Sequence, residues 1–302
     1  MIPSFLNAGD LLLVVAPAFS ANEVEVRSGI IQLEKMGFRV ETGQSVFSSW
    51  GKFAGTDSER KADLQWAMDH SEAKAIICTR GGYGLGRILA ELNFDTFRTN
   101  PKWLIGFSDI TLIHLRLHEL EIASVHGPMT VHFSRTEQSE ACNSLIRIIK
   151  GEIPSVSYPV QPERQVTQNI SGLLSGGNLT MISHSAGKLK PGVFSGSVLF
   201  LEEIGEYHYR IDRMLEQLRQ SGMFEGIKAV VLGQFTDCEA DRFPLSVAEM
   251  VSEKLPEGVP VFSGLESGHG VPTFPLIFGT MTEIEKDETG FRLKQRLRPV
   301  IS

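Results

Sequence analysis

Continuous apolar runs alternate with predicted helices in the first half of the chain. Residues 11–16 and 73–79 are apolar runs typical of strands buried on both faces, and residues 38–46 form a weaker third run. Residues 22–36, with apolar side chains at helical spacing, and residues 57–70 are predicted helices. Strands that alternate with helices predict an α/β fold with a parallel sheet and helical crossovers.

A further apolar run, residues 103–105, leads into Gly106, Ser108 and a segment with apolar side chains at helical spacing as far as Leu120. This pattern predicts a strand, a sharp turn at Ser108 and a helix. A serine on such a turn projects its hydroxyl above the strand end, close to unpaired N–H groups at the helix start. Ser108 is therefore a candidate nucleophile on a nucleophile elbow. The alternative is that Ser108 or Asp109 caps the helix, a position that both residue types favour.

Residues 79–87 form a glycine-rich segment directly after another predicted strand, so we expect them at the same edge of the sheet as Ser108. They do not fit the dinucleotide motif G-x-G-x-x-G, because its last position falls on Arg87 or Leu89. Glycine lets backbone N–H groups approach a reacting carbonyl closely, which suits an oxyanion hole. A tight turn without chemistry is the alternative.

Residues 152–168 contain three prolines, mixed polar residues and no helical period, which predicts a linker. This linker separates an N-terminal α/β domain, residues 1–151, from a C-terminal domain, residues 169–302. The second half contains an amphipathic helix at residues 209–220. Strands are predicted at residues 196–203, 229–234, 259–264, 276–281 and 290–297. Their predominance predicts a strand-rich α+β domain.

A serine nucleophile needs a base, and the base needs an orienting carboxylate. His269 lies between two glycines just after a predicted strand, which places an imidazole on an open loop. Glu202 and Glu203 end a predicted apolar strand, and the strand period alone does not choose between them. The alternatives are an exposed loop histidine and carboxylates that belong to a solvated strand end or a salt bridge.

Metal and cysteine chemistry have weaker support. His114 and His118 lie one helical turn apart, a spacing that can bind zinc. However, Leu115 follows His114, so the H-E-x-x-H motif is absent, and no third ligand is apparent. Two histidines on a solvated helix face are the commoner arrangement. Cys78 lies inside an apolar strand, where thiols are usually inert packing groups.

Composition narrows the class of protein. The 302 residues are 42% hydrophobic and 22% charged, with a net charge of −7, so there is no cationic field for a nucleic acid. No apolar run approaches the length of a membrane span, and the N-terminus lacks the cationic region of a signal peptide. The three cysteines are far apart and lack CxxC spacing, which favours reduced thiols and a cytoplasmic location.

Six motifs, in the same order along the chain, resemble the LD-carboxypeptidases. This family of serine peptidases includes the murein tetrapeptide carboxypeptidases and the microcin C immunity proteins. The motifs are Arg80-Gly81-Gly82-Tyr83-Gly84, Gly106-Phe107-Ser108-Asp109-Ile110-Thr111, His126-Gly127-Pro128-Met129, Leu174-Ser175-Gly176-Gly177-Asn178-Leu179, Leu201-Glu202-Glu203 with Tyr209-Arg210-Ile211-Asp212-Arg213-Met214-Leu215, and Gly268-His269-Gly270. The family usually has tyrosine at Phe107 and aspartate at Glu203, and neither difference removes a reacting group.

The resemblance implies roles for three of these residues. Ser108 would be the nucleophile, His269 the base and Glu202 the orienting carboxylate. It also implies an N-terminal α/β domain that holds Ser108 and a C-terminal strand-rich domain that supplies the other two, with the active site between them. The family works without a metal or other cofactor, is typically cytoplasmic and commonly forms homodimers.

The mechanism that follows from the resemblance places the oxyanion on backbone N–H groups. These would come from Asp109 and from Gly81 or Gly82. The free carboxylate of the substrate needs a cation, for which Arg80 or Arg87 could serve; a salt bridge on a helix face is the alternative for these arginines. The expected substrate-binding side chains are Arg80, Tyr83 and Arg87.

The implied substrate is the murein tetrapeptide, cut between the L-centre of the diamino acid and the terminal D-alanine, as in peptidoglycan recycling. The alternative is the immunity-type hydrolysis of aminoacyl nucleotides. That activity needs a surface for the adenine, often an aromatic one. Tyr158 is the only aromatic residue in the 152–168 segment, which contains no tryptophan. We therefore favour recycling. A third hypothesis, a catalytically silent binding module, is disfavoured by the presence of Ser108, Glu202 and His269.

Overall fold

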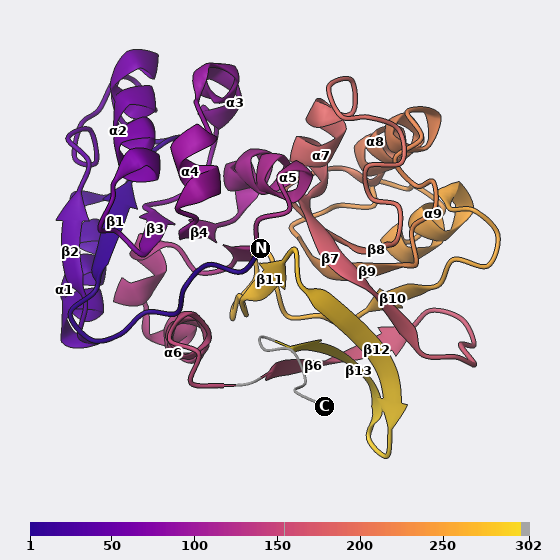
Figure 1. The fold of residues 1–302 in the computed structure, drawn as a ribbon. Helices are drawn as coiled ribbons and strands as arrows, with labels where there is room; N and C mark the ends of the chain where they lie inside the picture. Colours follow the sequence, from indigo (N-terminus) through magenta and orange to yellow (C-terminus); the bar gives the residue numbers. More distant parts are fainter. Residues whose placement is uncertain (154, 297–302) are drawn as a thin grey trace. The chain divides into compact units, whose positions relative to one another are not determined.

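The computed structural model describes residues 1–153 and 155–296, which form two compact units (Figure 1). Unit 1 comprises Met1–Glu152 and Val271–Leu276. Unit 2 comprises Ile153–Gly270 and the described residues from Ile277 on. Pro154 of the predicted linker and the end of the predicted strand at residue 297 lie outside the described residues.

A six-stranded sheet has the order β11-β5-β4-β3-β1-β2, and its strands β1 to β5 form the centre of unit 1. Its strands are β1 (Leu11–Val15), β2 (Arg39–Thr42), β3 (Ala75–Cys78), β4 (Trp103–Gly106), β5 (Ser124–His126) and β11 (Leu276–Phe278). Strands β1 to β5 pair in parallel, and every residue of β1, β3 and β4 is buried. The predicted N-terminal α/β domain with a parallel sheet is confirmed.

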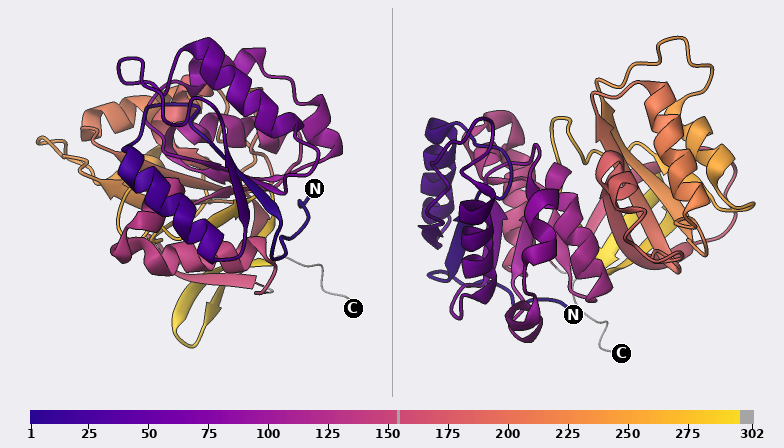
Figure 2. Two further views of the ribbon diagram at one scale, coloured as in Figure 1. Left: turned by 90° about the vertical axis from the view of Figure 1, so that its left-hand side faces the viewer. Right: turned by 90° about the horizontal axis from the view of Figure 1, so that it is seen from above.

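Helices lie on both faces of this sheet (Figure 2). They are α1 (Glu23–Lys35), α2 (Asp57–Asp69), α3 (Leu85–Ile88), α4 (Asp95–Thr99), α5 (Thr111–Glu119) and α6 (Ser139–Ile149). Side chains fix where α1 and α2 begin: Asn22 caps α1, and Thr56 forms a reciprocal capping box with Glu59 at α2. In the strand order β1 stands between β2 and β3, so the chain reverses direction across the sheet at the β1–β3 pair. Ligand sites of α/β sheets form at such a point, beyond the carboxyl ends of the strands.

A closed barrel forms the centre of unit 2, in the order β10-β6-β13-β12-β7-β8-β9. Its strands are β6 (Ser155–Pro162), β7 (Ile170–Asn178), β8 (Ser197–Ile204), β9 (Ala229–Thr236), β10 (Val261–Ser263), β12 (Met281–Asp287) and β13 (Gly290–Arg296). Strands β7 to β10 pair in parallel and the remaining pairs are antiparallel. The helices of this unit are α7 (Leu179–Ser185), α8 (His208–Gln220) and α9 (Val247–Lys254). The prediction of a strand-rich C-terminal domain is confirmed.

Two sequence expectations differ from the observed elements. The stretch expected as a linker, residues 152–168, includes β6, which pairs with β13 and buries Val156 and Val160 at alternate positions. The single strand expected at residues 276–281 is divided into β11 and β12. Gly279 adopts a left-handed φ of 76° between them, and its N–H donates to the carbonyl of Leu174. No helix among residues 1–153 and 155–296 is long and apolar enough to cross a membrane.

Candidate active site

The turn after β4 holds Ser108 in a conformation that is rare for a serine. Its φ of 66° lies in the left-handed region, and residues 108–110 form one turn of 3₁₀ helix before α5 begins. Neither the 3₁₀ turn nor α5 has a side-chain hydrogen bond at its N-cap, so the alternative role of Ser108 or Asp109 as a helix cap is not observed. A strained serine on a strand–turn–helix junction is the local geometry of a nucleophile elbow.

The glycine-rich loop between β3 and α3 approaches this turn at Gly81. A Cβ added to Gly81 would lie 2.7 Å from Cβ and 3.0 Å from Oγ of Ser108. Gly82 has a φ of 113°, and a Cβ there would lie 2.4 Å from the ring of Phe19. Only glycine fits at positions 81 and 82, because the backbone of the loop lies directly against Ser108 at the first position and against the ring of Phe19 at the second.

The side chain of Asp109 lies in the interior of unit 1, 1% exposed. Its Oδ2 accepts the backbone N–H of Leu85 at 2.8 Å, at the start of α3. Burial raises the pKa of Asp109 to about 6, although the Leu85 N–H, the charge of Arg60 and the neighbouring backbone of Gly84 oppose that rise. The carboxylate therefore connects the elbow to the far end of the glycine-rich loop.

The three expected substrate-binding side chains have different surroundings. Arg87 forms a two-pronged ion pair with Asp57, at 2.7 to 3.0 Å, and the hydrogen bond from Arg87 lowers the pKa of Asp57. Arg80 is exposed and donates to the carbonyl of Ser20 at 3.5 Å. Tyr83 is 50% exposed and belongs to a cluster of four aromatic side chains. The other three are Phe19, Trp50 and Phe53.

In unit 2, β8 and the loop after β10 bring a carboxylate and an imidazole together. His269 Nδ1 and Glu202 Oε2 are 2.6 Å apart; the Glu202 side chain is 0% exposed and that of His269 is 14% exposed. Burial lowers the pKa of His269, but the hydrogen bond and charge of Glu202, with a contribution from Glu203, outweigh it, so the net shift is upward. The pair holds the imidazole in one orientation and favours its protonated form.

Backbone contacts position this pair. A Cβ on Gly268 would lie 3.1 Å from Cβ and Oε2 of Glu202, so the loop carrying His269 passes closely over the carboxylate. The loop is held on β9, where Gln234 N–H donates to the carbonyl of Ser267 and Gln234 Oε1 accepts the N–H of Gly270, both at 2.9 Å. The register between β8 and β9 shifts here by one residue, an irregularity that redirects side chains next to a site.

Glu203, the neighbour of Glu202, performs a different task. Its carboxylate accepts the N–H and the hydroxyl of Thr180, both at 2.7 Å, and Nδ2 of Asn178 at 2.9 Å. Burial raises the pKa of Glu203, and these hydrogen bonds limit the rise. Glu203 thus anchors the N-terminus of α7, whereas Glu202 contacts His269. Asn178 lies in one of the six family motifs, but no role was predicted for it. Gln234 lies outside these motifs, and its only signal in the sequence was a polar residue at the end of a predicted strand.

His114 is engaged inside unit 1. Its ring nitrogens lie 2.8 Å from Ser124 Oγ and 2.8 Å from the carbonyl oxygen of Gly106, and burial lowers its pKa to about 4. Both nitrogens that a metal would need are therefore occupied. Within the described part of the chain, no group of three or more His, Cys, Asp or Glu residues is arranged to hold a metal ion. Burial also raises the pKa of the Cys78 thiol, as expected for a packing cysteine.

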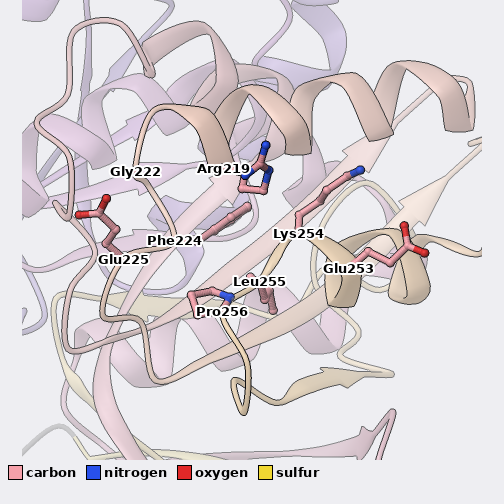
Figure 3. A pocket seen from close by; sticks show the side chains of 8 residues that line it. All are labelled: Arg219, Gly222, Phe224, Glu225, Glu253, Lys254, Leu255 and Pro256. Atoms are coloured by element: carbon pink, nitrogen blue, oxygen red, sulfur yellow. The ribbon is translucent and has the colours of Figure 1, made fainter.

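A pocket of about 360 Å³ lies elsewhere in unit 2, at the ends of α8 and α9 (Figure 3). Its lining residues are Arg219, Gly222, Phe224, Glu225, Glu253, Lys254, Leu255 and Pro256. Arg219 is paired with Glu216, and Lys254 with Asp212 at 3.1 Å. None of the expected site residues lines this pocket, and both of its cations already have carboxylate partners.

Comparisons with known proteins extend these observations. The model of the LD-carboxypeptidase N-terminal domain matches residues 12–127, and that of the LD-carboxypeptidase C-terminal domain matches residues 171–284. The murein tetrapeptide carboxypeptidase of Pseudomonas aeruginosa is 33% identical, over 90% of this chain and 92% of that protein.

Solved structures share the fold. The muramoyltetrapeptide carboxypeptidase of Oxalobacter formigenes is 27% identical with a TM-score of 0.81, over 96% of this chain and all of that one. MccF in complex with glutamyl sulfamoyl guanosine has a TM-score of 0.87 at 19% identity, over 98% of both chains. The two family models together match most of the chain, in the order in which the two units follow one another. The chain therefore belongs to the LD-carboxypeptidase family of serine peptidases.

Proposed function

We propose that this protein is a serine LD-carboxypeptidase that releases the terminal D-alanine of a murein tetrapeptide, in the recycling of peptidoglycan. The observation that carries the proposal is the partly buried hydrogen bond between Glu202 and His269, because an oriented imidazole with a raised pKa is what a general base requires. The strained Ser108 supplies the nucleophile. The relatives named for murein tetrapeptide and muramoyltetrapeptide carboxypeptidases support the choice of substrate.

The proposed reaction proceeds through an acyl-enzyme. Ser108 Oγ attacks the amide carbonyl carbon while His269 Nε2 takes the hydroxyl proton, since Nδ1 is directed to Glu202. The tetrahedral intermediate collapses when His269 returns this proton to the amine of D-alanine, which leaves. Water then attacks the ester by the same route and restores the serine. The carboxylate of Glu202 stabilises the imidazolium in both steps.

The oxyanion hole of this mechanism is built from backbone groups of unit 1. We assign the N–H of Asp109 and one N–H from Gly81 or Gly82, because the loop lies against Ser108 where a side chain would not fit. Removal of one such donor typically slows an enzyme by about 100- to 1000-fold. For the substrate carboxylate we propose Arg80, since Arg87 already holds Asp57 with three hydrogen bonds.

The second candidate is the hydrolysis of an aminoacyl nucleotide by the same groups. It is favoured by one observation, the exposed aromatic side chains of Trp50 and Tyr83 beside the glycine-rich loop, which offer a surface for a nucleobase. Tyr158, the aromatic residue considered from the sequence, is a half-buried residue of β6.

The test compares kcat/KM for two substrates with the same enzyme preparation. Free L-Ala–D-Glu–meso-diaminopimelate–D-Ala is assayed for D-alanine, and glutamyl sulfamoyl adenosine is assayed for glutamate. We expect efficient release of D-alanine and little release of glutamate. The reverse ranking would replace the recycling function with the second candidate.

A further inference from the structure

The glycine-rich loop between β3 and α3 is fastened at both of its ends. At its start, the N–H of Thr79 donates to the carbonyl of Val15 at 2.8 Å, and its carbonyl accepts the N–H of Val131 at 3.3 Å. Gly82 and Gly84 then adopt φ angles of 113° and 143°, which only glycine tolerates easily. The fastening of these two ends therefore contributes to the position of the peptide groups around Gly81, together with the contact of Gly82 with Phe19 and the packing of Tyr83 on Phe19 and Phe53.

The far end of the loop is fastened by a side chain from the elbow itself. Asp109 Oδ2 accepts the N–H of Leu85 at 2.8 Å, 24 residues away along the chain. Asp109 directly follows Ser108, so the residue beside the nucleophile holds the loop whose backbone reaches the nucleophile at Gly81. This hydrogen bond thus links the loop directly to the residue beside the serine.

The buried carboxylate of Asp109 does not favour the stability of the fold. Asp109 is 1% exposed, and its Oδ1 accepts no hydrogen bond from any residue that the structure describes. A buried, half-paired carboxylate carries a desolvation cost that an apolar side chain would avoid. Residues that break the rules of core packing in this way are expected where function requires them.

A buried cation lies under the same loop. Arg60 Nε donates to the carbonyl of Gly55 at 3.3 Å, its Nη1 to the carbonyl of Pro17, and its Nη2 pairs with Asp57. A Cβ on Gly84 would lie 2.7 Å from Arg60 Nη1, so the guanidinium is in contact with the loop next to Leu85. The charge of Arg60 favours the ionised form of Asp109.

We propose that Asp109 is a positioning residue: its carboxylate ties Leu85 to the elbow and so holds the Gly81–Gly82 backbone at the distance from Ser108 at which it meets the oxyanion. The inference rests on the proposed role of Ser108 as the nucleophile. It assigns to the side chain of Asp109 a task separate from that of its backbone N–H. A displacement of the loop by about 1 Å is enough to cost about 100-fold in rate.

The experiment measures the second-order rate at which a fluorophosphonate labels Ser108, because the phosphoryl oxygen of this reagent occupies the oxyanion hole. Asp109→Ala removes the acceptor for Leu85, and we expect labelling to slow by about 10- to 100-fold. Asp109→Asn retains an oxygen acceptor and should recover most of that loss. With the tetrapeptide, the loss should appear in kcat with KM changed less, since the oxyanion forms only after binding.

Asp63→Ala provides the matched control. Asp63 is also a buried carboxylate of unit 1, and it accepts the backbone N–H groups of Gln44 and Ser45 at 3.0 and 2.7 Å. Its replacement should lower the melting temperature without slowing the labelling of Ser108. If Asp109→Ala does not fold, Asp109→Ser makes the same comparison with a hydroxyl too short to reach Leu85.

Labelling of Asp109→Ala at the wild-type rate would overturn the inference, and so would an equal loss in Asp63→Ala or no recovery in Asp109→Asn. Wild-type protein that labels at Ser108 but leaves the tetrapeptide intact overturns the proposed substrate alone. Wild-type protein that is not labelled at Ser108 overturns both.

Discussion

Glu202 and Glu203 are adjacent carboxylates on β8 with separate partners. Glu202 contacts His269 Nδ1 at 2.6 Å, and Glu203 accepts three hydrogen bonds from Asn178 and Thr180 at the start of α7. Both are buried, so each depends on its partners to offset the desolvation of its charge. Substitutions at the two positions should therefore change different properties.

Replacement of Glu202 by glutamine should reduce kcat by about a thousandfold, because the imidazolium loses its counter-charge and the imidazole its orientation. It should also move the acidic limb of the profile of kcat/KM against pH. Wild-type activity should fall as the pH drops through the pKa of His269, which lies above its usual 6.5. Without the charge of Glu202 this pKa falls, so the limb moves to lower pH. An unchanged limb in Glu202→Gln would contradict the assignment of His269 as the base.

Replacement of Glu203 by glutamine is the companion measurement. A glutamine oxygen cannot accept all the hydrogen bonds around α7, so we expect a loss of about 1–3 kcal/mol in the free energy of unfolding. The acidic limb should shift less than in Glu202→Gln, since Glu203 contributes least to the pKa of His269. Chemical denaturation and a pH–rate profile of the same preparation separate the two effects.

His114 gives the fold a dependence on pH. Its folded pKa of about 4 is below the ordinary 6.5, so the folded protein favours the neutral imidazole. The resulting stability is present above pH 6.5 and is lost as the pH falls towards 4, by an amount of the order of 3 kcal/mol. In His114→Gln, the free energy of unfolding should fall less over this interval. The raised pKa of Asp109 makes the folded state more stable as the pH falls, which is the opposite effect. This contribution is the same in wild-type protein and in His114→Gln. Parallel pH profiles for the two proteins would contradict this account.

At the scale of elements, the elbow and the β3–α3 loop act as one structure. Gly81→Ala tests their contact, because the added Cβ would lie 2.7 Å from Cβ and 3.0 Å from Oγ of Ser108. We expect at least a tenfold loss of kcat from the displaced backbone. Gly187→Ala is the control, since no atom lies within 4 Å of the added Cβ. Full activity in Gly81→Ala would show that the loop does not need to approach the serine so closely.

The elements that could be predicted from the sequence are those with a strong apolar pattern. Strands β1, β3 and β4 are buried on both faces and appear as continuous apolar runs. By contrast, β6 buries little more than Val156 and Val160 and contains two prolines, so its sequence resembles a linker. Its strand structure comes from its pairing with β13, more than 120 residues later, a long-range contact that a local pattern does not contain.

At the scale of the whole molecule, the three proposed catalytic residues belong to two different units. Ser108 belongs to unit 1, whereas Glu202 and His269 belong to unit 2. The order of motifs along the sequence identified these three candidates. The hydrogen bond between Asp109 and Leu85 and the ion pair between Asp57 and Arg87 join residues 24 and 30 positions apart. No periodicity marks such contacts, so they were visible only in the fold.

The central claim is that Ser108 is the nucleophile of a metal-independent LD-carboxypeptidase. The most direct measurement is mass spectrometry of the free tetrapeptide incubated with wild-type protein, with Ser108→Ala and with wild-type protein plus a chelator. We expect wild-type protein to release D-alanine with or without the chelator, and Ser108→Ala to leave the tetrapeptide intact. Release of D-alanine by Ser108→Ala, or its loss on adding the chelator, would contradict the account.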